Sequence, residues 1–85
     1  AHPNPFNPIT TLRYDLPIDA FVTIGVYDML GKKIVQLVNS TQRAGSKSVR
    51  WDATDSMGKT VGAGVYLYQV QAGEFVETRK MVLLK

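Results

Sequence analysis

Residues 20–28, AFVTIGVYD, have the most regular hydrophobic pattern in the chain. Apolar β-branched residues stand at every second position, at Val22, Ile24 and Val26. Successive side chains of a β-strand point to opposite faces, so this spacing gives one face that is apolar throughout. The stretch therefore predicts a strand with one face in a core.

The residues after this strand reverse the chain. In the turn that follows, Asp28 can accept hydrogen bonds from its own backbone, and Gly31 supplies the positive φ that a tight turn needs. In the returning strand, Ile34 and Leu37 fall on opposite faces of a regular strand. We expect a β-bulge there, because one extra residue restores a common apolar face.

Further strands are expected on both sides of this hairpin. They are predicted at residues 9–16, 47–52, 60–61, 65–72 and 75–85. Residues 39–46 are polar and predict a loop. About seven short strands with no helical stretch are typical of an all-β, immunoglobulin-like antiparallel β-sandwich, with a small open barrel as the alternative. The predicted core consists of the inward residues of these strands, which are Val22, Ile24, Val26, Val49, Trp51, Tyr66, Tyr68 and Val70.

Length and composition argue against an enzyme. The chain has 85 residues, no cysteine, one histidine and a formal net charge of +3. A chain of this length forms one domain, which we place at residues 1–85, with residues 1–8 as a proline-rich lead-in from an upstream domain. With no cysteine and only His2, neither a Ser/His/Asp nor a Cys/His site can form. We expect no catalytic residue and no cofactor.

The charge is not arranged for nucleic acid. Residues 29–50 hold basic residues and no acid, whereas the stretches on either side are acidic on balance. The basic residues straddle predicted turns and lack the interleaved aromatics of a phosphate-binding surface. No apolar run approaches the roughly 18 residues of a membrane-spanning helix. We therefore expect neither a nucleic-acid partner nor a membrane-spanning segment.

Asp52 and Asp55 are the residues that we considered for a metal site. Two carboxylates three residues apart supply few of the six or more oxygens that a Ca²⁺ ion takes. An aspartate that caps its own turn explains the same residues. We therefore expect an Asx turn and no metal.

The two ends of the chain carry its most distinctive motifs. The lead-in contains Pro3, Asn4, Pro5, Phe6 and Asn7. The tail places four apolar residues between two lysines, in the order Lys80, Met81, Val82, Leu83, Leu84 and Lys85. An apolar strand edge is a docking surface for another protein. A strand buried on both faces explains the same run.

Together with segments between them, which include residues 16–17, 22–23, 26–28, 31–32 and 64–66, these ends resemble the C-terminal sorting domain (type A) of type IX secretion system cargo proteins. The resemblance implies a non-catalytic secretion and cell-surface sorting domain at the end of a larger secreted protein of a Bacteroidetes-like bacterium. It implies that an outer-membrane translocation machinery recognises residues 80–85 and that cleavage falls near residues 3–7. The implied partners are that machinery and the upstream cargo domain, and the implied location is secreted or on the cell surface.

The middle of the chain resembles a second family. Trp51, Asp52 and the glycine-rich stretch up to Tyr66 are similar to the immunoglobulin-like domain of flagellar hook-capping proteins. That family implies a structural subunit domain. A further alternative is an accessory immunoglobulin-like module that packs on a neighbouring hydrolase or assists its polysaccharide binding through exposed aromatics such as Phe21 and Tyr27.

Overall fold

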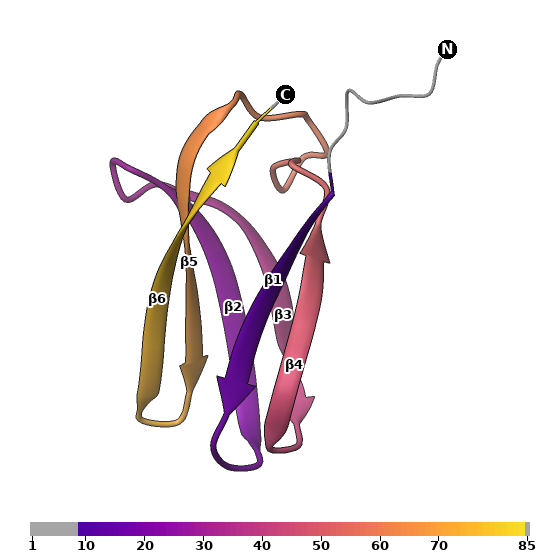
Figure 1. Ribbon diagram of the computed structural model, residues 1–85, viewed down its shortest axis with the longest axis vertical. Helices are drawn as coiled ribbons and strands as arrows, with labels where there is room; N and C mark the ends of the chain where they lie inside the picture. The colour runs from indigo at the N-terminus through magenta and orange to yellow at the C-terminus, as the bar shows by residue number, and fades with distance from the viewer. Residues whose placement is uncertain (1–8, 85) are drawn as a thin grey trace.

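The computed structural model describes residues 9–84 as two antiparallel sheets packed face to face (Figure 1). The strands are β1 (Thr10–Leu16), β2 (Ala20–Asp28), β3 (Lys33–Gln42), β4 (Gly45–Trp51), β5 (Gly64–Ala72) and β6 (Phe75–Leu83). β1 and β4 form a two-stranded sheet, and the other sheet has the order β3-β2-β5-β6. The predicted all-β, immunoglobulin-like sandwich is confirmed.

The core lies between the two sheets and is built around Trp51. This residue is 1% exposed, and its ring meets Tyr66 edge to face, with 5.4 Å between the ring centroids and 72° between the ring planes. An edge-to-face arrangement is favoured because the positive ring edge meets the negative ring face. All predicted core residues are buried except Val49, which is half-buried and packs against the core from its margin.

The predicted bulge in β3 is present as two shifts of register. The pairing of β2 with β3 shifts between Ile24 and Gly25 and again between Val26 and Tyr27. The β3 residues that these shifts skip are Leu37 and Ile34, whose positions conflict in a regular strand. Both are half-buried and pack against the core, so the shifts bring them to a common face.

The prediction of a loop at residues 39–46 is wrong. β3 continues to Gln42 and β4 begins at Gly45, so only two residues connect them. Pairing with β2 gives this polar stretch its backbone hydrogen bonds. Its side chains are largely exposed at the sheet edge, where strand formation does not require apolar residues.

The strand predicted at residues 60–61 is reduced to one bridge between Thr54 and Thr60. The described residues therefore form six strands rather than about seven. Ala53 has a φ of 65°, which lies outside the extended region and interrupts the backbone before the bridge. Gly62 and Gly64 follow, and glycine weakens strand formation because it has no side chain to pack.

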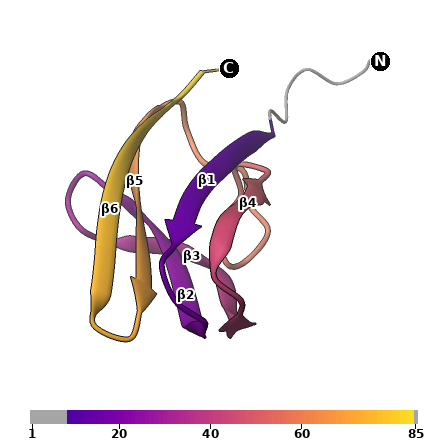
Figure 2. The same ribbon diagram turned by 60° about the horizontal axis from the view of Figure 1, so that its bottom comes forward.

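The smaller sheet covers only part of the larger one. In Figures 1 and 2, β5 and β6 lie to the left of β1, beyond the edge of the two-stranded sheet. The side chains of Glu77 and Arg79, which point to the inner face of β6, remain 31% and 45% exposed. The sandwich is therefore open along the side where β1 and β6 face each other.

Candidate functional site

The apolar tail belongs to the larger sheet. β6 pairs with β5 up to Leu83, which lies opposite Gly64. Leu83 is 3% exposed and Met81 packs against the core, whereas Val82 and Leu84 are exposed. The tail is therefore an edge strand with one buried face, and it is not a free apolar run.

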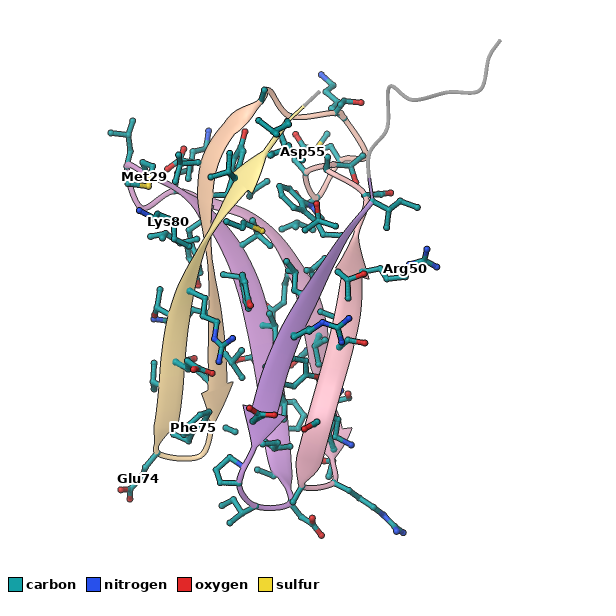
Figure 3. All side chains as sticks on the ribbon, in the orientation of Figure 1. Met29, Arg50, Asp55, Glu74, Phe75 and Lys80 are labelled. Carbon is teal, nitrogen blue, oxygen red and sulfur yellow. The ribbon has the colours of Figure 1, made fainter. Side chains whose placement is uncertain are left out.

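The other residues predicted for sorting do not gather with it. Lys80 is exposed on the outer face of β6, as its label in Figure 3 shows. Lys85 lies outside the described residues. The lead-in lies outside them as well, with Pro3, Asn4, Pro5, Phe6 and Asn7.

Asp55 caps a turn, as the sequence predicted. Its Oδ1 accepts hydrogen bonds from the backbone N–H groups of Lys59 (3.0 Å) and Met57 (2.9 Å). These bonds stabilise the carboxylate, so they lower the pKa of Asp55 from its ordinary value. Oδ1 of Asp52 instead accepts a hydrogen bond from the hydroxyl of Thr54 at 2.5 Å.

The structure therefore gives Asp52 and Asp55 separate local partners. Among residues 9–84, no three His, Cys, Asp or Glu side chains gather in a way that could hold a metal ion. The calcium question at this pair stays a prediction, and the calcium dependence of the melting midpoint would test it.

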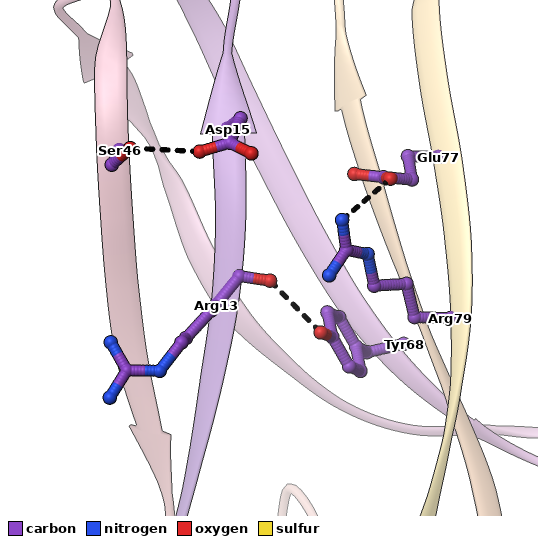
Figure 4. A network of polar contacts seen from close by, with 6 residues as sticks. All are labelled: Arg13, Asp15, Ser46, Tyr68, Glu77 and Arg79. Atoms are coloured by element: carbon purple, nitrogen blue, oxygen red, sulfur yellow. Dashed lines mark hydrogen bonds and ion pairs between the residues drawn. The ribbon is translucent and has the colours of Figure 1, made fainter.

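A polar cluster lines the open side of the sandwich (Figure 4). The hydroxyl of Tyr68 donates a hydrogen bond to the backbone carbonyl of Arg13 at 2.9 Å. Arg79 and Glu77 form an ion pair at 2.9 Å on the inner face of β6. We call the strip lined by Arg13, Asp15, Tyr68, Glu77 and Arg79 the β1–β6 slot.

Two hollows open into this slot. One, of about 410 Å³, lies among Arg13, Asp15 and Arg79. The other, of about 440 Å³, lies among Leu16, Phe75 and Glu77. Both are lined by residues of β1 and of β6, so both extend across the outer edge of β1.

The slot carries fixed charge. The hydrogen bond from Arg79 to Glu77 raises the pKa of the Arg79 guanidinium, and the charge of Glu77 adds to this effect. On β1, Oδ1 of Asp15 accepts a hydrogen bond from the hydroxyl of Ser46 at 2.9 Å. Arginine, carboxylate and an open strand edge are groups that bind polypeptide.

A third hollow, of about 220 Å³, lies on the outer face of the larger sheet. The ring of Tyr27 covers Gly25, and a Cβ atom at Gly25 would lie 3.0 Å from the Tyr27 hydroxyl oxygen. The rest of it is lined by Thr23, Lys33, Gln36, Gln69 and Gln71. Tyr27 is thus held against its own sheet, whereas Phe21 is 55% exposed.

The sequence analysis did not identify the β1–β6 slot. The available signal was the pattern of β6. Its inward positions are apolar at Phe75, Met81 and Leu83, but Glu77 and Arg79 place charges between them. Charged residues at inward positions of an edge strand indicate a face that is not fully covered. Residues 9–84 contain no helix that is long and apolar enough to cross a membrane.

Fold and site together define an immunoglobulin-like module with a charged, open side. Residues 8–74 match the model of a known family, the FlgD Ig-like domain. The match spans most of the chain, and the chain belongs to this family. No curated protein gives a match.

A solved structure supports the same assignment. The crystal structure of FLGD from P. aeruginosa is similar to this chain with a TM-score of 0.74 and 26% sequence identity. The likeness covers 89% of this chain and 61% of that chain. This chain therefore spans less than two thirds of the FLGD chain.

These findings overturn the predicted sorting function. The family match and the structural likeness both lead to FlgD, and neither leads to a type IX sorting domain or to an accessory module of a hydrolase. The sorting prediction was wrong because it relied on short motifs along the chain, above all on those at the two ends. The apolar motif at the tail is explained by its place in an edge strand, where Met81 and Leu83 point inward and Val82 points outward.

Proposed function

We propose that this chain is a non-catalytic scaffold module of the flagellar hook-capping kind, which acts by holding other protein segments in place. The observation that carries the proposal is the match of residues 8–74 to the FlgD Ig-like domain. The likeness to FLGD of P. aeruginosa supports it at the level of the fold.

The chemistry of the surface supports a role in holding protein. Residues 9–84 include neither His nor Cys, and the charged groups of the β1–β6 slot are an arginine pair and two carboxylates. Such groups bind backbone and side chains of a polypeptide rather than activate a nucleophile. A hook-capping role also requires export of the chain, which the sequence analysis predicted and which stays a prediction.

The test is made in the bacterium that encodes the chain. Deletion of residues 1–85 from the encoded protein should abolish hook assembly, as seen by electron microscopy, and should abolish swimming. Restoring the domain should restore both. A Trp51→Ala version, which lacks the centre of the core, should fail, and a Phe21→Ala version, changed at an exposed position, should succeed. Normal hooks in the deletion strain, or a source bacterium without hooks, would contradict the proposal.

A further inference from the structure

The outer edge of β1 has no strand beside it in the described structure. β1 pairs with β4 only. Because the Tyr68 hydroxyl reaches the carbonyl of Arg13 from the side of β6, the backbone groups of Arg13 point away from β4. Backbone groups alternate in direction along a strand, so those of Thr11 and Asp15 point the same way. The carbonyl of Arg13 already accepts the Tyr68 hydroxyl, so an additional strand can pair with this edge through the N–H groups of Thr11, Arg13 and Asp15 and through the carbonyls of Thr11 and Asp15.

The space beside this edge suits one extended strand better than a second folded copy. A new strand would lie about 4.8 Å from β1, above the inner face of β6. The hollows of about 410 and 440 Å³ are lined by β4 and β1 as well as by β6, and they reach this path from the β1–β4 pair. β5 and β6 extend beyond β1 on this side (Figure 2), so a second copy joined through its own β1 would have to place its larger sheet beside them. An extended segment has no such second layer.

The side chains on the inner face of β6, which form the floor of the slot, limit which polypeptide segments can bind there. Glu77 and Arg79 point inward from β6 and pair with each other. Inward charges on an edge strand discourage unselective strand addition, because an apolar strand would have to cover them. Phe75 and Met81, at the two ends of the strand, are half-buried and offer apolar contact. The slot therefore favours a segment that is not apolar throughout.

The outer face of β1 sets the charge of the occupant. Arg13 and Asp15 are two residues apart, so both side chains point outward, to the face opposite Leu12 and Tyr14. In an antiparallel pair, directly opposed residues share a face, and opposite charges there stabilise the pairing. An incoming strand therefore gains most with a basic residue opposite Asp15 and, two positions later, an acidic residue opposite Arg13.

We propose that the β1–β6 slot accepts one extended segment of a protein partner, antiparallel to β1, in which a basic residue is followed two positions later by an acidic one. The proposal rests on the proposed function, because it names the surface by which the scaffold holds its partner. The partner segment adds a third strand to the smaller sheet through backbone hydrogen bonds, and its charges fix direction and register.

Two synthetic peptides of identical composition test the proposal. The first has the sequence Thr-Lys-Thr-Glu-Val-Thr, and the second, Thr-Glu-Thr-Lys-Val-Thr, exchanges the two charges. Each carries a fluorophore and is titrated with the 85-residue chain at low ionic strength, with fluorescence anisotropy as the readout. We expect saturable binding of the first peptide and about tenfold weaker binding of the second, since two opposite-charge pairs become like-charge pairs.

Variants place the binding on β1. The double variant Arg13→Glu, Asp15→Lys should reverse the order of the two peptides. Arg50→Glu is the matched control, because Arg50 is also exposed on the smaller sheet but points away from the slot (Figure 3). It should leave the order unchanged. Hydrogen exchange should slow at the amides of Thr11, Arg13 and Asp15 when the first peptide binds.

Several results would overturn the proposal. Absence of binding by either peptide would mean that the charged floor only keeps the edge solvated. Equal binding of both peptides would mean that Arg13 and Asp15 select nothing. Binding that appears only after residues 1–8 are removed would assign the slot to a segment of this chain. A dimer that the double variant dissolves would assign it to a second copy. The hook phenotype of the deletion strain is independent of all these results, so the two proposals can fail separately.

Discussion

Two turns of this molecule share one five-residue pattern, Asp-x-x-Gly-Lys, at residues 28–32 and 55–59. In each, Oδ1 of the aspartate accepts two backbone N–H groups at 2.9 to 3.0 Å. In each, the aspartate N–H donates to the lysine carbonyl and the glycine N–H donates to the aspartate carbonyl. Gly31 and Gly58 have φ values of 88° and 82°. The same local sequence therefore builds the same local geometry twice.

The two turns differ in what they connect. The first joins β2 to β3 in a long hairpin, whereas the second is flanked by a single bridge between Thr54 and Thr60. The second turn is held from the side: Ser56 N–H donates to the carbonyl of Ile34 at 3.1 Å, and Trp51 Nε1–H donates to the carbonyl of Thr54 at 2.9 Å. The comparison teaches that local hydrogen bonds make a turn, but the flanking residues decide whether strands grow from it.

The largest effect should come from replacing Trp51, the core residue whose indole N–H holds the second turn. Trp51→Ala should lower the free energy of unfolding by about 3–5 kcal/mol, because it leaves a large cavity in the core. It also removes the hydrogen bond to Thr54. Chemical denaturation measures the loss. Phe21→Ala, at a 55% exposed position, is the control and should change stability by less than about 1 kcal/mol. A Trp51→Ala protein as stable as this control would show that Trp51 stabilises neither the core nor the second turn.

The second-largest loss of stability should come from removing the aspartate of either turn, and it should be nearly equal in the two turns. Asp28→Ala and Asp55→Ala each remove an acceptor of two backbone N–H groups. Each should lower the melting midpoint by about 5–10 °C. The corresponding Asp→Asn variants keep an acceptor oxygen and should lose less. A much larger loss at Asp28 than at Asp55 would mean that the long hairpin depends on its turn.

The glycines should sharpen the comparison further. Gly31→Ala and Gly58→Ala should each cost about 1 kcal/mol, because both positions have positive φ. A Cβ atom at either position meets no atom within 4 Å, so backbone strain alone sets the cost. Thermal unfolding of the two variants should agree within about 0.5 kcal/mol. A clear difference between the two losses of stability would show that residues flanking the turns, outside the shared five-residue pattern, strain the backbone.

This contrast also explains what the sequence could predict. The strand with Val22 and Ile24, the turn at Asp28 and the burial of Trp51 follow from residues close together in the chain. The inward charges of β6 indicate an uncovered face, but the β1–β6 slot as a whole was not predicted, because it depends on the choice of neighbours for β1 and β6, which lie at opposite ends of the described chain. The tail was misassigned because a short apolar run does not distinguish a paired edge strand from a free docking segment.

The smallest expected effect is the pH dependence of the second turn. The hydrogen bonds from Lys59 and Met57 lower the pKa of Asp55 below its ordinary value of 3.8. A carboxyl with a lowered folded-state pKa stabilises the fold at pH values above its unfolded pKa, and this contribution is lost as the pH falls through the folded-state pKa. The melting midpoints of the wild type and of Asp55→Asn should therefore differ by a constant amount above about pH 5 and converge as the pH falls below 3.8. The side-chain carboxyl of Asp55, followed by NMR, should titrate below 3.8. A titration midpoint above 3.8 would mean that the hydrogen bonds from Lys59 and Met57 do not stabilise the Asp55 carboxylate in solution. The two turns would then share their backbone geometry without a stabilised charge on Asp55.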